Sequence, residues 1–568
     1  MMDRLAFLAL VALSGMTAVG SVRTCRDIVI YGSSPAAISA ALQAKRMGRS
    51  AVVVSPETRI GGLTTGGLGQ TDIGNKNAFG GIALEFYKAI ASYYRDDANW
   101  KWQKREEYFP DGQCADSKDV DSMWTFEPSA ALRVLEGWER RYGIEIHRGK
   151  RLDRSPGKVR MIEVEGHRRI AFFVTENGDE YAGKVFVDAT YEGDLMASAG
   201  VSYTVGREAN SVYGETINGN APDAEGAWNH NINDGVSPYV KAGDKGSGLL
   251  PGVEPFDPLA RTGDGDRRVQ AYCFRMCLTD VPENRIEFAM PESYSERNYE
   301  LLFRDYEAAW SRPDACPIGA RVWPGGGIPA NMSKMPNRKT DSNNRCGFST
   351  DFIGANWNWP EASYEERDHI LKAHLDYQMG LMWTLANHPR IPKEVRTYFS
   401  AFGTCKDEFQ DGLGRGWQRQ LYVREARRMV GEYVMTEHNC RGTIVARKPV
   451  AMGAYTMDSH HVRRIETKDG FVRNEGNVED HDFPGPYGID YGSIVPKRGE
   501  CENLMVPVCI SASHIAFGSI RMEPVFFALG QAAGTAGSIA VVRGVAVQDV
   551  PYAELAEQLV ADGQVIRR

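Results

Sequence analysis

The 568 residues carry 66 Lys and Arg against 74 Asp and Glu, a net charge of −8 that argues against nucleic acid as the main partner. Hydrophobic residues make up 42% and charged residues 25%, as in ordinary globular chains. The 59 glycines exceed the average share of roughly 7% for proteins, so their positions carry information.

Residues 1–20 have the pattern of a secretory signal peptide. Arg4 precedes an apolar run from Leu5 to Leu13, and small residues follow up to Gly20. We expect cleavage near Gly20 and a secreted or periplasmic protein without a stable membrane span, because the apolar run is too short to cross a bilayer. An uncleaved N-terminal membrane anchor is the alternative.

The ten cysteines allow one or more disulfides but are too sparse for a disulfide scaffold. Cys273 and Cys277 are expected on one strand, about 13 Å apart, too far to pair with each other. No Cys-x-x-Cys pair occurs and histidines are few, so we predict no metal site.

Residues 27–55 predict a strand, a tight turn, a helix and a second strand. The apolar strand ends at Gly32, the helix opens with Ser34 and Pro35, and a second buried strand ends at Ser55. The turn is a degenerate dinucleotide fingerprint, in which small residues let backbone approach a pyrophosphate at a helix N-terminus. The candidate cofactor-binding residues here are Gly32, Ser33, Ser34, Pro35, Ala36, Ala37 and Ser55. Ser55 stands where an acid that binds ribose is expected, and Glu57 follows two residues later.

A glycine-rich segment, residues 59–72, comes next. Five glycines fall within nine residues and alternate with Thr and Leu, unlike a flexible Gly/Ser linker. Such a loop lets backbone lie against a flat or phosphorylated ligand. The segment therefore predicts close approach of backbone to such a ligand.

The following residues predict helices at 80–96 and 129–141 and short alternating strands between 144 and 189. The last strand ends at Ala189, consistent with a strand that returns to the nucleotide site. We therefore expect residues 25–200 and 451–568 to form one discontinuous cofactor-binding domain around a substrate region, residues 201–450.

The substrate region predicts helices near 296–310, 363–387 and 417–436. Arginines in it are candidates to hold an anion, and histidines just beyond it are candidates to take a proton from a substrate. On the helix predicted at 417–436, Arg424 shares a face with Arg427 or Arg428. The catalytic candidates are His460, His461, His514, Arg424 and Arg338.

Towards the C-terminus the sequence predicts a buried strand at 503–510, a loop at 511–524 and a helix of small residues from 525 to 537. The helix N-terminus is a candidate site for negative charge, such as that on a reduced flavin. Further cofactor-binding candidates in the loop are Ser513, Arg521 and Glu523.

With these residues in view, the chain resembles the FAD-dependent oxidoreductase family with a glutathione-reductase-type Rossmann domain, related to fumarate reductase flavoproteins. Within it, the chain is similar to an uncharacterised bacterial group sometimes labelled xanthan lyase. The resemblance rests on the segments 30–37, 61–69, 188–196, 421–429 and 511–534. It implies an α/β fold with a Rossmann-like FAD/NAD(P)-binding domain of the three-layer ββα type and an inserted α+β substrate region. It also implies FAD as the cofactor, with its pyrophosphate at Gly32, Ser34 and Ala37. Further flavin contacts are implied at Gly61, Gly62 and Gly67.

The sequence therefore predicts an oxidoreductase in which FAD accepts a hydride from a small organic substrate, of a hydroxylated, sugar-like kind, and passes electrons to an unknown acceptor. A carbohydrate lyase or binding protein on a Rossmann-like scaffold is the alternative, because fold alone does not determine function.

Overall fold

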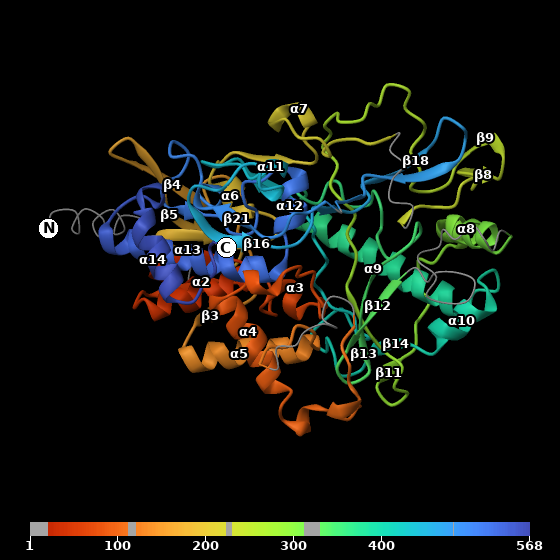
Figure 1. The fold of residues 1–568 in the computed structure, drawn as a ribbon, viewed down its shortest axis with the longest axis horizontal. Helices are drawn as coiled ribbons and strands as arrows, with labels where there is room; N and C mark the ends of the chain where they lie inside the picture. Colours follow the sequence, from red (N-terminus) through yellow and green to blue (C-terminus); the bar gives the residue numbers. More distant parts are fainter. Residues whose placement is uncertain (1–20, 112–120, 223–229, 312–329, 481, 568) are drawn as a thin grey trace.

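The computed structural model describes residues 21–111, 121–222, 230–311, 330–480 and 482–567. The predicted signal peptide at 1–20, Cys114 and Cys316 lie outside these ranges. In Figure 1 the red and blue ends of the chain lie together on the left, and the green middle of the chain forms the right-hand part.

The left-hand part is built on a seven-stranded sheet with the order β3-β2-β1-β6-β5-β4, in which β22 also pairs with β6. The strands are β1 Arg23–Tyr31, β2 Ala51–Val54, β3 Glu145–His147, β4 Val159–Val164, β5 His167–Val174, β6 Glu180–Asp188 and β22 Leu504–Met505. β6 runs parallel to β1, whereas β4 and β5 are antiparallel. The short strands predicted between 144 and 189 are present, and the last of them, β6, returns to lie beside β1.

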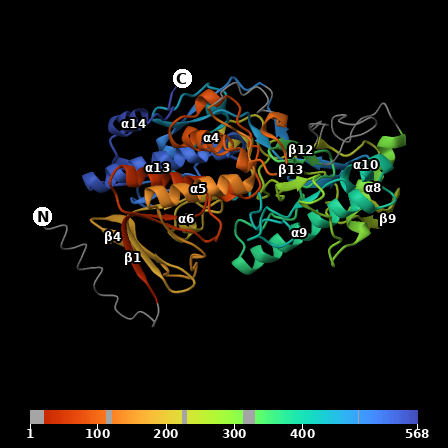
Figure 2. The same cartoon turned by 90° about the horizontal axis from the view of Figure 1, so that it is seen from below.

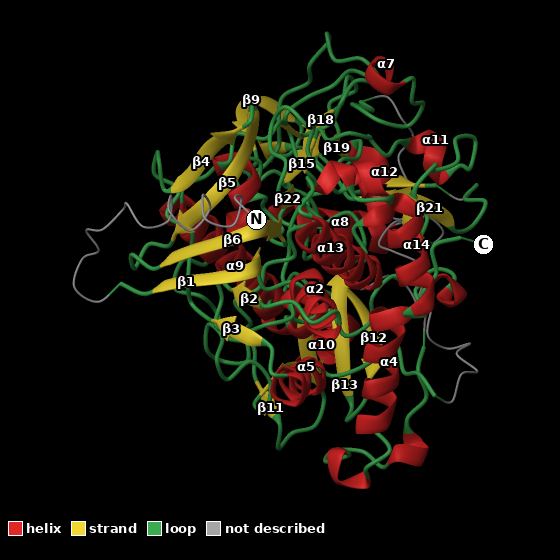
Figure 3. Ribbon diagram, turned by 90° about the vertical axis from the view of Figure 1, so that its left-hand side faces the viewer, coloured by secondary structure: helices red, strands yellow, loops and turns green. Residues whose placement is uncertain are grey.

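A group of helices lies beside this sheet, with α2 and α13 packed directly against it (Figures 2 and 3). They are α2 Pro35–Arg46, α4 Gly81–Tyr93, α5 Pro128–Tyr142, α13 Glu523–Arg543 and α14 Tyr552–Ala561. A Cβ added at Gly530 of α13 would lie 2.3 Å from the carbonyl oxygen of Ala36 in α2, so only glycine allows this approach of the two helices. The arrangement is a Rossmann-like α/β fold, as predicted, and the C-terminal segment completes it.

The right-hand part contains a five-stranded antiparallel sheet with the order β11-β14-β10-β13-β12. The strands are β10 Met276–Thr279, β11 Arg285–Ile286, β12 Ala330–Met335, β13 Lys339–Asn344 and β14 Gly403–Cys405. Three helices accompany it, namely α8 Glu300–Ser311, α9 Tyr364–Asn387 and α10 Lys393–Ser400. The predicted α+β character and the helices near 296–310 and 363–387 are confirmed.

The prediction of a helix at 417–436 is wrong. Residues 421–426 form neither helix nor strand, and β15 Arg427–Met429 pairs with β7 Tyr203–Val205. Charged side chains in this segment are buried and bonded on several sides, which a single helical face does not provide. Tertiary pairing thus outweighs the helical propensity of the segment.

The C-terminal segment differs from its prediction in two places. The strand predicted at 503–510 is limited to β22, in part because Pro507 has no N–H to donate to a ladder. The loop predicted at 511–524 contains α12 His514–Ile520, whose N-cap Ser513 accepts a bond from the Ala516 N–H. This cap starts a helix that hydrophobic spacing alone did not indicate.

Among the described residues, α13 is the helix long and apolar enough to cross a membrane. Most of its apolar stretch is buried inside the protein, as in the core helix of a folded domain.

Candidate functional site

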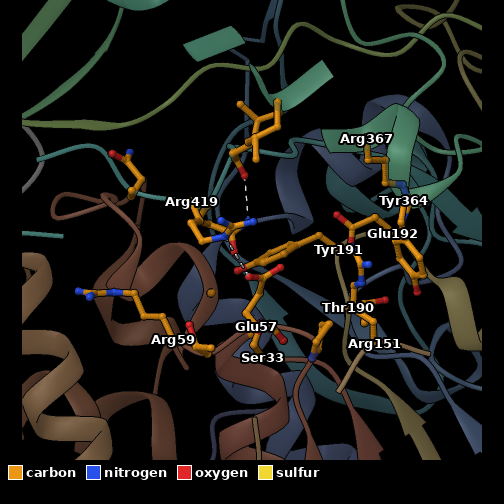
Figure 4. A pocket seen from close by; sticks show the side chains of 18 of the residues that line it. Ser33, Glu57, Arg59, Arg151, Thr190, Tyr191, Glu192, Tyr364, Arg367 and Arg419 are labelled. Carbon is orange, nitrogen blue, oxygen red and sulfur yellow. Dashed lines mark hydrogen bonds and ion pairs between the residues drawn. The ribbon is translucent and has the colours of Figure 1, made fainter. Parts of the chain in front are cut away.

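A cavity of about 130 Å³, open at its mouth, lies where β1, β2 and β6 end (Figure 4). The predicted residues Ser33, Ser34, Gly62 and Ala189 line it. Side chains from α9 and from the segment 409–421 form the opposite wall. The cavity therefore lies between the two parts of the molecule, at the carboxyl end of a parallel sheet, where such folds bind ligands.

The floor of the cavity requires glycine. Gly32 has φ +135°, and a Cβ there would lie 2.4 Å from the Ala189 carbonyl oxygen. A Cβ at Gly62 would lie 2.3 Å from the Tyr191 hydroxyl. Ser34 Oγ donates to the same Ala189 oxygen at 2.6 Å and holds the turn against the end of β6. Small residues here let the turn and the glycine-rich segment pack closely against the residues that follow β6.

The N-terminus of α2 points its free N–H groups at this floor. Ser34 is the N-cap, Pro35 occupies the first turn, and no acidic residue stands in that turn. The first N–H groups of a helix lack helical partners and, with the helix dipole, attract an anion such as a pyrophosphate. Ala36 and Ala37 are fully buried beneath it, and their small side chains let the helix pack closely.

An acidic side chain enters the cavity from the loop after β2. Ser55 itself is buried, and its Oγ donates to the Glu57 carbonyl oxygen at 2.6 Å. The Glu57 carboxylate lines the cavity with 45% of its side chain exposed, and its Oε2 lies 3.9 Å from Arg419 Nε (Figure 4). Glu57 is therefore placed to bind the ribose, the role for which the sequence has no acid at Ser55.

Glu523 joins three chain segments beneath the cavity. It accepts bonds from the Thr64 N–H at 3.0 Å, the Thr64 hydroxyl at 2.6 Å and the Tyr191 hydroxyl at 2.9 Å. Burial raises its pKa to about 7, and the hydrogen bonds oppose that rise. Glu523 does not line the cavity. It ties the start of α13 to the glycine-rich segment and to the residues after β6.

A buried ion-pair cluster fastens the inserted part to the Rossmann-like part. Asp194 Oδ2 lies 2.6 Å from Arg367 of α9, and Asp194 Oδ1 lies 3.0 Å from Arg154 and 2.8 Å from Arg427. Burial would raise the pKa of Asp194, but the three guanidinium groups hold it well below its usual range. Arg367 and Asp194 also line the cavity, so their ion pair fixes the distance between the two parts of the molecule at this point of the cavity.

A second polar cluster lies beyond the glycine-rich segment. His460 is buried, with Nδ1 2.8 Å from Asp351 Oδ2 and Nε2 3.7 Å from Asp458 Oδ2. Burial and the nearby Arg424 lower the pKa of His460 to about 3, so its imidazole is neutral at pH 7. Burial raises the pKa of Asp458 to about 6. At neutral pH the cluster therefore holds a neutral imidazole beside Asp458, a carboxyl group whose pKa lies close to that pH.

Three arginines surround the ring of Tyr422 beside that histidine. The guanidinium carbons of Arg424, Arg275 and Arg521 lie 4.4, 5.6 and 5.8 Å from the ring centre. Each is paired with an aspartate, yet Arg424 Nε, Arg275 Nη1 and Arg521 Nε are buried without a hydrogen-bond partner. We call these three residues the arginine cluster.

The arginine cluster adjoins the glycine-rich segment. A Cβ at Gly67 would lie 2.1 Å from the carbonyl oxygen of Arg275, and Arg275 Nη2 donates to the Gln70 carbonyl oxygen at 3.1 Å. Leu421, next to Tyr422, lines the cavity. The predicted Gly67 therefore lies against the backbone of the arginine cluster, whereas Gly61 lies against Thr65 and Leu135, and neither glycine lines the cavity.

The other two histidine candidates, His514 and His461, form hydrogen bonds with groups outside the arginine cluster. His514 bonds Glu425 at 2.7 Å and Ser459 at 3.1 Å, so both ring nitrogens have partners. His461 Nε2 bonds the His230 carbonyl oxygen at 2.8 Å, and burial lowers the pKa of His461 to about 4.

Arg428 and Ser513 have structural partners. Arg428 binds Glu208, Ala512 and Gly206, and the Ser513 hydroxyl donates to Glu215 at 2.5 Å.

Arg338 does not join the cluster. Its half-exposed side chain pairs with Asp280 at 2.9 Å, in a surface hollow that shares no lining residue with the cavity. It precedes β13, whereas Asn344 at the end of β13 contacts Arg424, and six residues of strand span about 20 Å.

Several cavity residues were not among the candidates from the sequence. They are Arg59, Arg151, Thr190, Tyr191, Glu192, Tyr364, Arg367 and Arg419. Thr190, Tyr191 and Glu192 directly follow the predicted strand end at Ala189, so position along the chain could have indicated them. Tyr364 and Arg367 of α9, and Arg419, are far from these residues in the sequence, and only folding brings them to the cavity.

The glycine cradle, the helix N-terminus and the acidic side chain after β2 define a dinucleotide site, and its residues fit the pyrophosphate and ribose of FAD. A family model described as FAD dependent oxidoreductase matches residues 27–559. The chain therefore belongs to the FAD-dependent oxidoreductase family, and FAD is its cofactor.

Comparison with solved structures adds distant matches. A flavin-containing monooxygenase from Stenotrophomonas maltophilia is 16% identical over 33% of this chain and 43% of its own, with a TM-score of 0.18. A 3-ketosteroid-Δ4-(5α)-dehydrogenase from Rhodococcus jostii RHA1 is 15% identical over 30% and 47%, with a TM-score of 0.18. THI4 from Thermovibrio ammonificans is 15% identical over 36% and 72%, with a TM-score of 0.22.

This chain spans less than half the length of the first two proteins, and at these TM-scores the matches carry no inference about its reaction. No curated protein matches the sequence.

Proposed function

We propose that this FAD-dependent oxidoreductase removes a hydride and a proton from a polar, hydroxylated organic substrate bound at the arginine cluster. The observation that carries the proposal is the neutral, buried His460 beside three arginines with unpaired N–H groups, next to the glycine-rich wall of the FAD cavity. Bound FAD supplies an acceptor for the hydride.

His460 is the proposed base. The Asp351 carboxylate accepts a hydrogen bond from Nδ1–H, so the lone pair at Nε2 can receive the substrate's hydroxyl proton. Asp458, beside Nε2 and with a pKa raised to about 6, is placed to pass the proton on. The remaining candidates His461 and His514 are bonded elsewhere, which favours His460.

The arginine cluster is the proposed substrate clamp. A buried N–H without a partner costs free energy, which an oxygen of the substrate would recover. Gln270 Nε2 is a further buried donor without a partner, and the Gln270 side-chain oxygen accepts a hydrogen bond from the backbone N–H of His460. This set of donors favours a substrate rich in oxygen, such as a sugar or an organic acid, and no observation favours the lyase alternative.

The proposed location is outside the cytosol, on the pattern of residues 1–20, with N-terminal anchoring as the alternative. The proposed partners are a small-molecule substrate and an electron acceptor of unknown identity.

The test is anaerobic reduction of the FAD-loaded protein by a panel of sugars and organic acids, followed as loss of flavin absorbance. We expect a substrate that bleaches the flavin, and we expect His460→Gln to slow bleaching at least about 100-fold because a general base contributes that much. His461→Gln, in the neighbouring histidine, should change the rate only a few-fold. Unchanged rates in His460→Gln, or no bleaching by any compound, would overturn the proposal.

A further inference from the structure

Cys277 and Cys405 face each other across neighbouring strands of the inserted sheet. β10 and β14 are antiparallel, with Leu278 opposite Thr404, so the same register places Cys277 opposite Cys405. Their Sγ atoms lie 3.7 Å apart. Directly opposite residues have Cα atoms about 4.5–5.5 Å apart, within the range that a disulfide spans. Rotation of the side chains is therefore enough to bring the sulfur atoms to bonding distance.

The surroundings favour a cross-link over a reactive thiol. Both side chains are buried against Met335 and Phe409. Burial and the neighbouring Cys405 raise the pKa of Cys277 well above its usual value, so the folded dithiol is a poor nucleophile. Cys405 Sγ also donates to the carbonyl oxygen of Cys277 at 3.5 Å, and the buried Cys501 and Cys509 contact oxygen atoms elsewhere in the described part of the chain.

β14 leads directly into a wall of the FAD cavity. Two residues after Cys405, Asp407 and then Glu408 bind Lys339 Nζ at 2.9 and 2.8 Å. Phe409, Asp411 and Gly412 follow and line the cavity. A covalent bond at Cys405 would hold the start of this segment against β10.

We propose that Cys277 and Cys405 form an intramolecular disulfide in the mature protein. Both S–H bonds break and one S–S bond forms. The two electrons and two protons pass by thiol–disulfide exchange to a disulfide-bearing oxidant, such as a disulfide-donating oxidoreductase or oxidised glutathione, which becomes two thiols. The exchange takes place during folding, before the thiols are buried.

The disulfide closes a loop of 128 residues that contains α8, α9 and α10. Closing a loop of this length restricts the unfolded chain and so stabilises the folded one. It also keeps the segment 407–412 in place around FAD. The proposal concerns covalent structure and does not depend on the identity of the substrate.

The test is peptide mapping of the full-length protein produced in a bacterial periplasm. The protein is denatured in the presence of iodoacetamide, which labels free thiols. It is then digested with trypsin without reduction and analysed by mass spectrometry. Cys277 lies in the tryptic peptide 276–285 and Cys405 in 397–406, and neither contains another cysteine. We expect these peptides joined, two hydrogens lighter than their sum, and separated by reduction. Cys440, in peptide 429–441, should carry the label. Labelled Cys277 and Cys405, or a link to any other cysteine, would overturn the proposal.

A second measurement addresses the cavity wall. Cys277→Ala with Cys405→Ala should lower the Tm of the FAD-loaded protein by about 3 °C or more and speed FAD release several-fold. The matched control, Cys440→Ala with Cys501→Ala, removes two buried thiols without removing the cross-link. Equal FAD release from the two double variants would overturn the role in the cavity wall, and a joined peptide pair in the wild type would support the disulfide in either case.

Discussion

Single residues in the cofactor site divide into those set by backbone shape and those set by distant partners. Gly32, Ser34 and Ala189 could be predicted because a tight turn beneath a dinucleotide tolerates only small side chains. Arg338 and Arg428 could not be placed, since the sequence does not say which carboxylate each arginine meets. Glu57 lies between these cases, close to the expected position but two residues late.

Glu57→Gln tests whether this residue binds the adenosine ribose. A charge-assisted hydrogen bond contributes about 1.5–3 kcal/mol, so the apoprotein of the variant should bind FAD about 10- to 100-fold more weakly. Binding of FMN, which lacks the adenosine, should be unchanged. Titration of apoprotein with each flavin by fluorescence measures both affinities, and an equal loss for FMN and FAD would contradict the assignment.

At the scale of elements, local pattern was sufficient where the hydrophobic period continued through the whole element. The strand–turn–helix at 27–46, α9 and α13 are of this kind. It failed at 417–436, where buried ion pairs hold the chain in a non-helical conformation, and at α12, which begins with a cap. In both cases the interactions that decide the element lie outside a hydrophobic period.

Packing of α13 against α2 should depend on the lack of a side chain at Gly530. In Gly530→Ala the new Cβ would lie 2.1 Å from Ser39 Oγ and 2.3 Å from the Ala36 carbonyl oxygen, so the helices must separate. Overpacking of this kind lowers the free energy of unfolding by about 1–3 kcal/mol. Because α2 carries the phosphate-binding N-terminus, FAD affinity should fall as well.

Gly137→Ala is the matched control for that variant. Gly137 lies within α5 with no atom within 4 Å of an added Cβ. Replacement of an open helical glycine by alanine should raise the free energy of unfolding by about 0.5–1 kcal/mol. Urea unfolding of both variants measures the two shifts, and the interpretation fails if Gly530→Ala is as stable as Gly137→Ala.

At the scale of the whole molecule, the FAD cavity exists because separate parts of the chain meet. From the C-terminal segment, β22 pairs with β6 in the first sheet and α13 packs against that sheet. From the inserted part, α9 carries Tyr364 and Arg367 into the cavity. The ion pairs of Asp194 couple these parts, so folding of the inserted part and formation of the cavity should be cooperative.

Buried histidines should make the stability of the whole molecule fall in acid. Burial lowers the pKa of His374 in α9 to about 4, whereas an exposed histidine titrates near 6.5. The unfolded chain therefore binds the proton first as the pH falls, and stability is full above pH 6.5 and is lost towards pH 4. For this one residue the loss is about 3 kcal/mol.

His374→Gln should accordingly flatten the decline of Tm between pH 6.5 and 4. His369→Gln, on the exposed side of the same helix, should leave the curve parallel to that of the wild type. Thermal unfolding at several pH values measures both slopes, and identical slopes for His374→Gln and the wild type would contradict the prediction.

The amino-acid sequence alone determined the Rossmann-like class and the dinucleotide turn, because these depend on short-range backbone geometry that small residues make possible. FAD as the cofactor came from the resemblance of the sequence to a flavoprotein family, and the family model matches it. Only the tertiary structure decided which charged residues share a site. The pairing of His460 with Asp351 and Asp458, the arginines around Tyr422 and the contact of Cys277 with Cys405 join residues far apart in the chain. Their charge and chemistry are visible in the sequence, but their partners are set by how the two parts of the fold pack together.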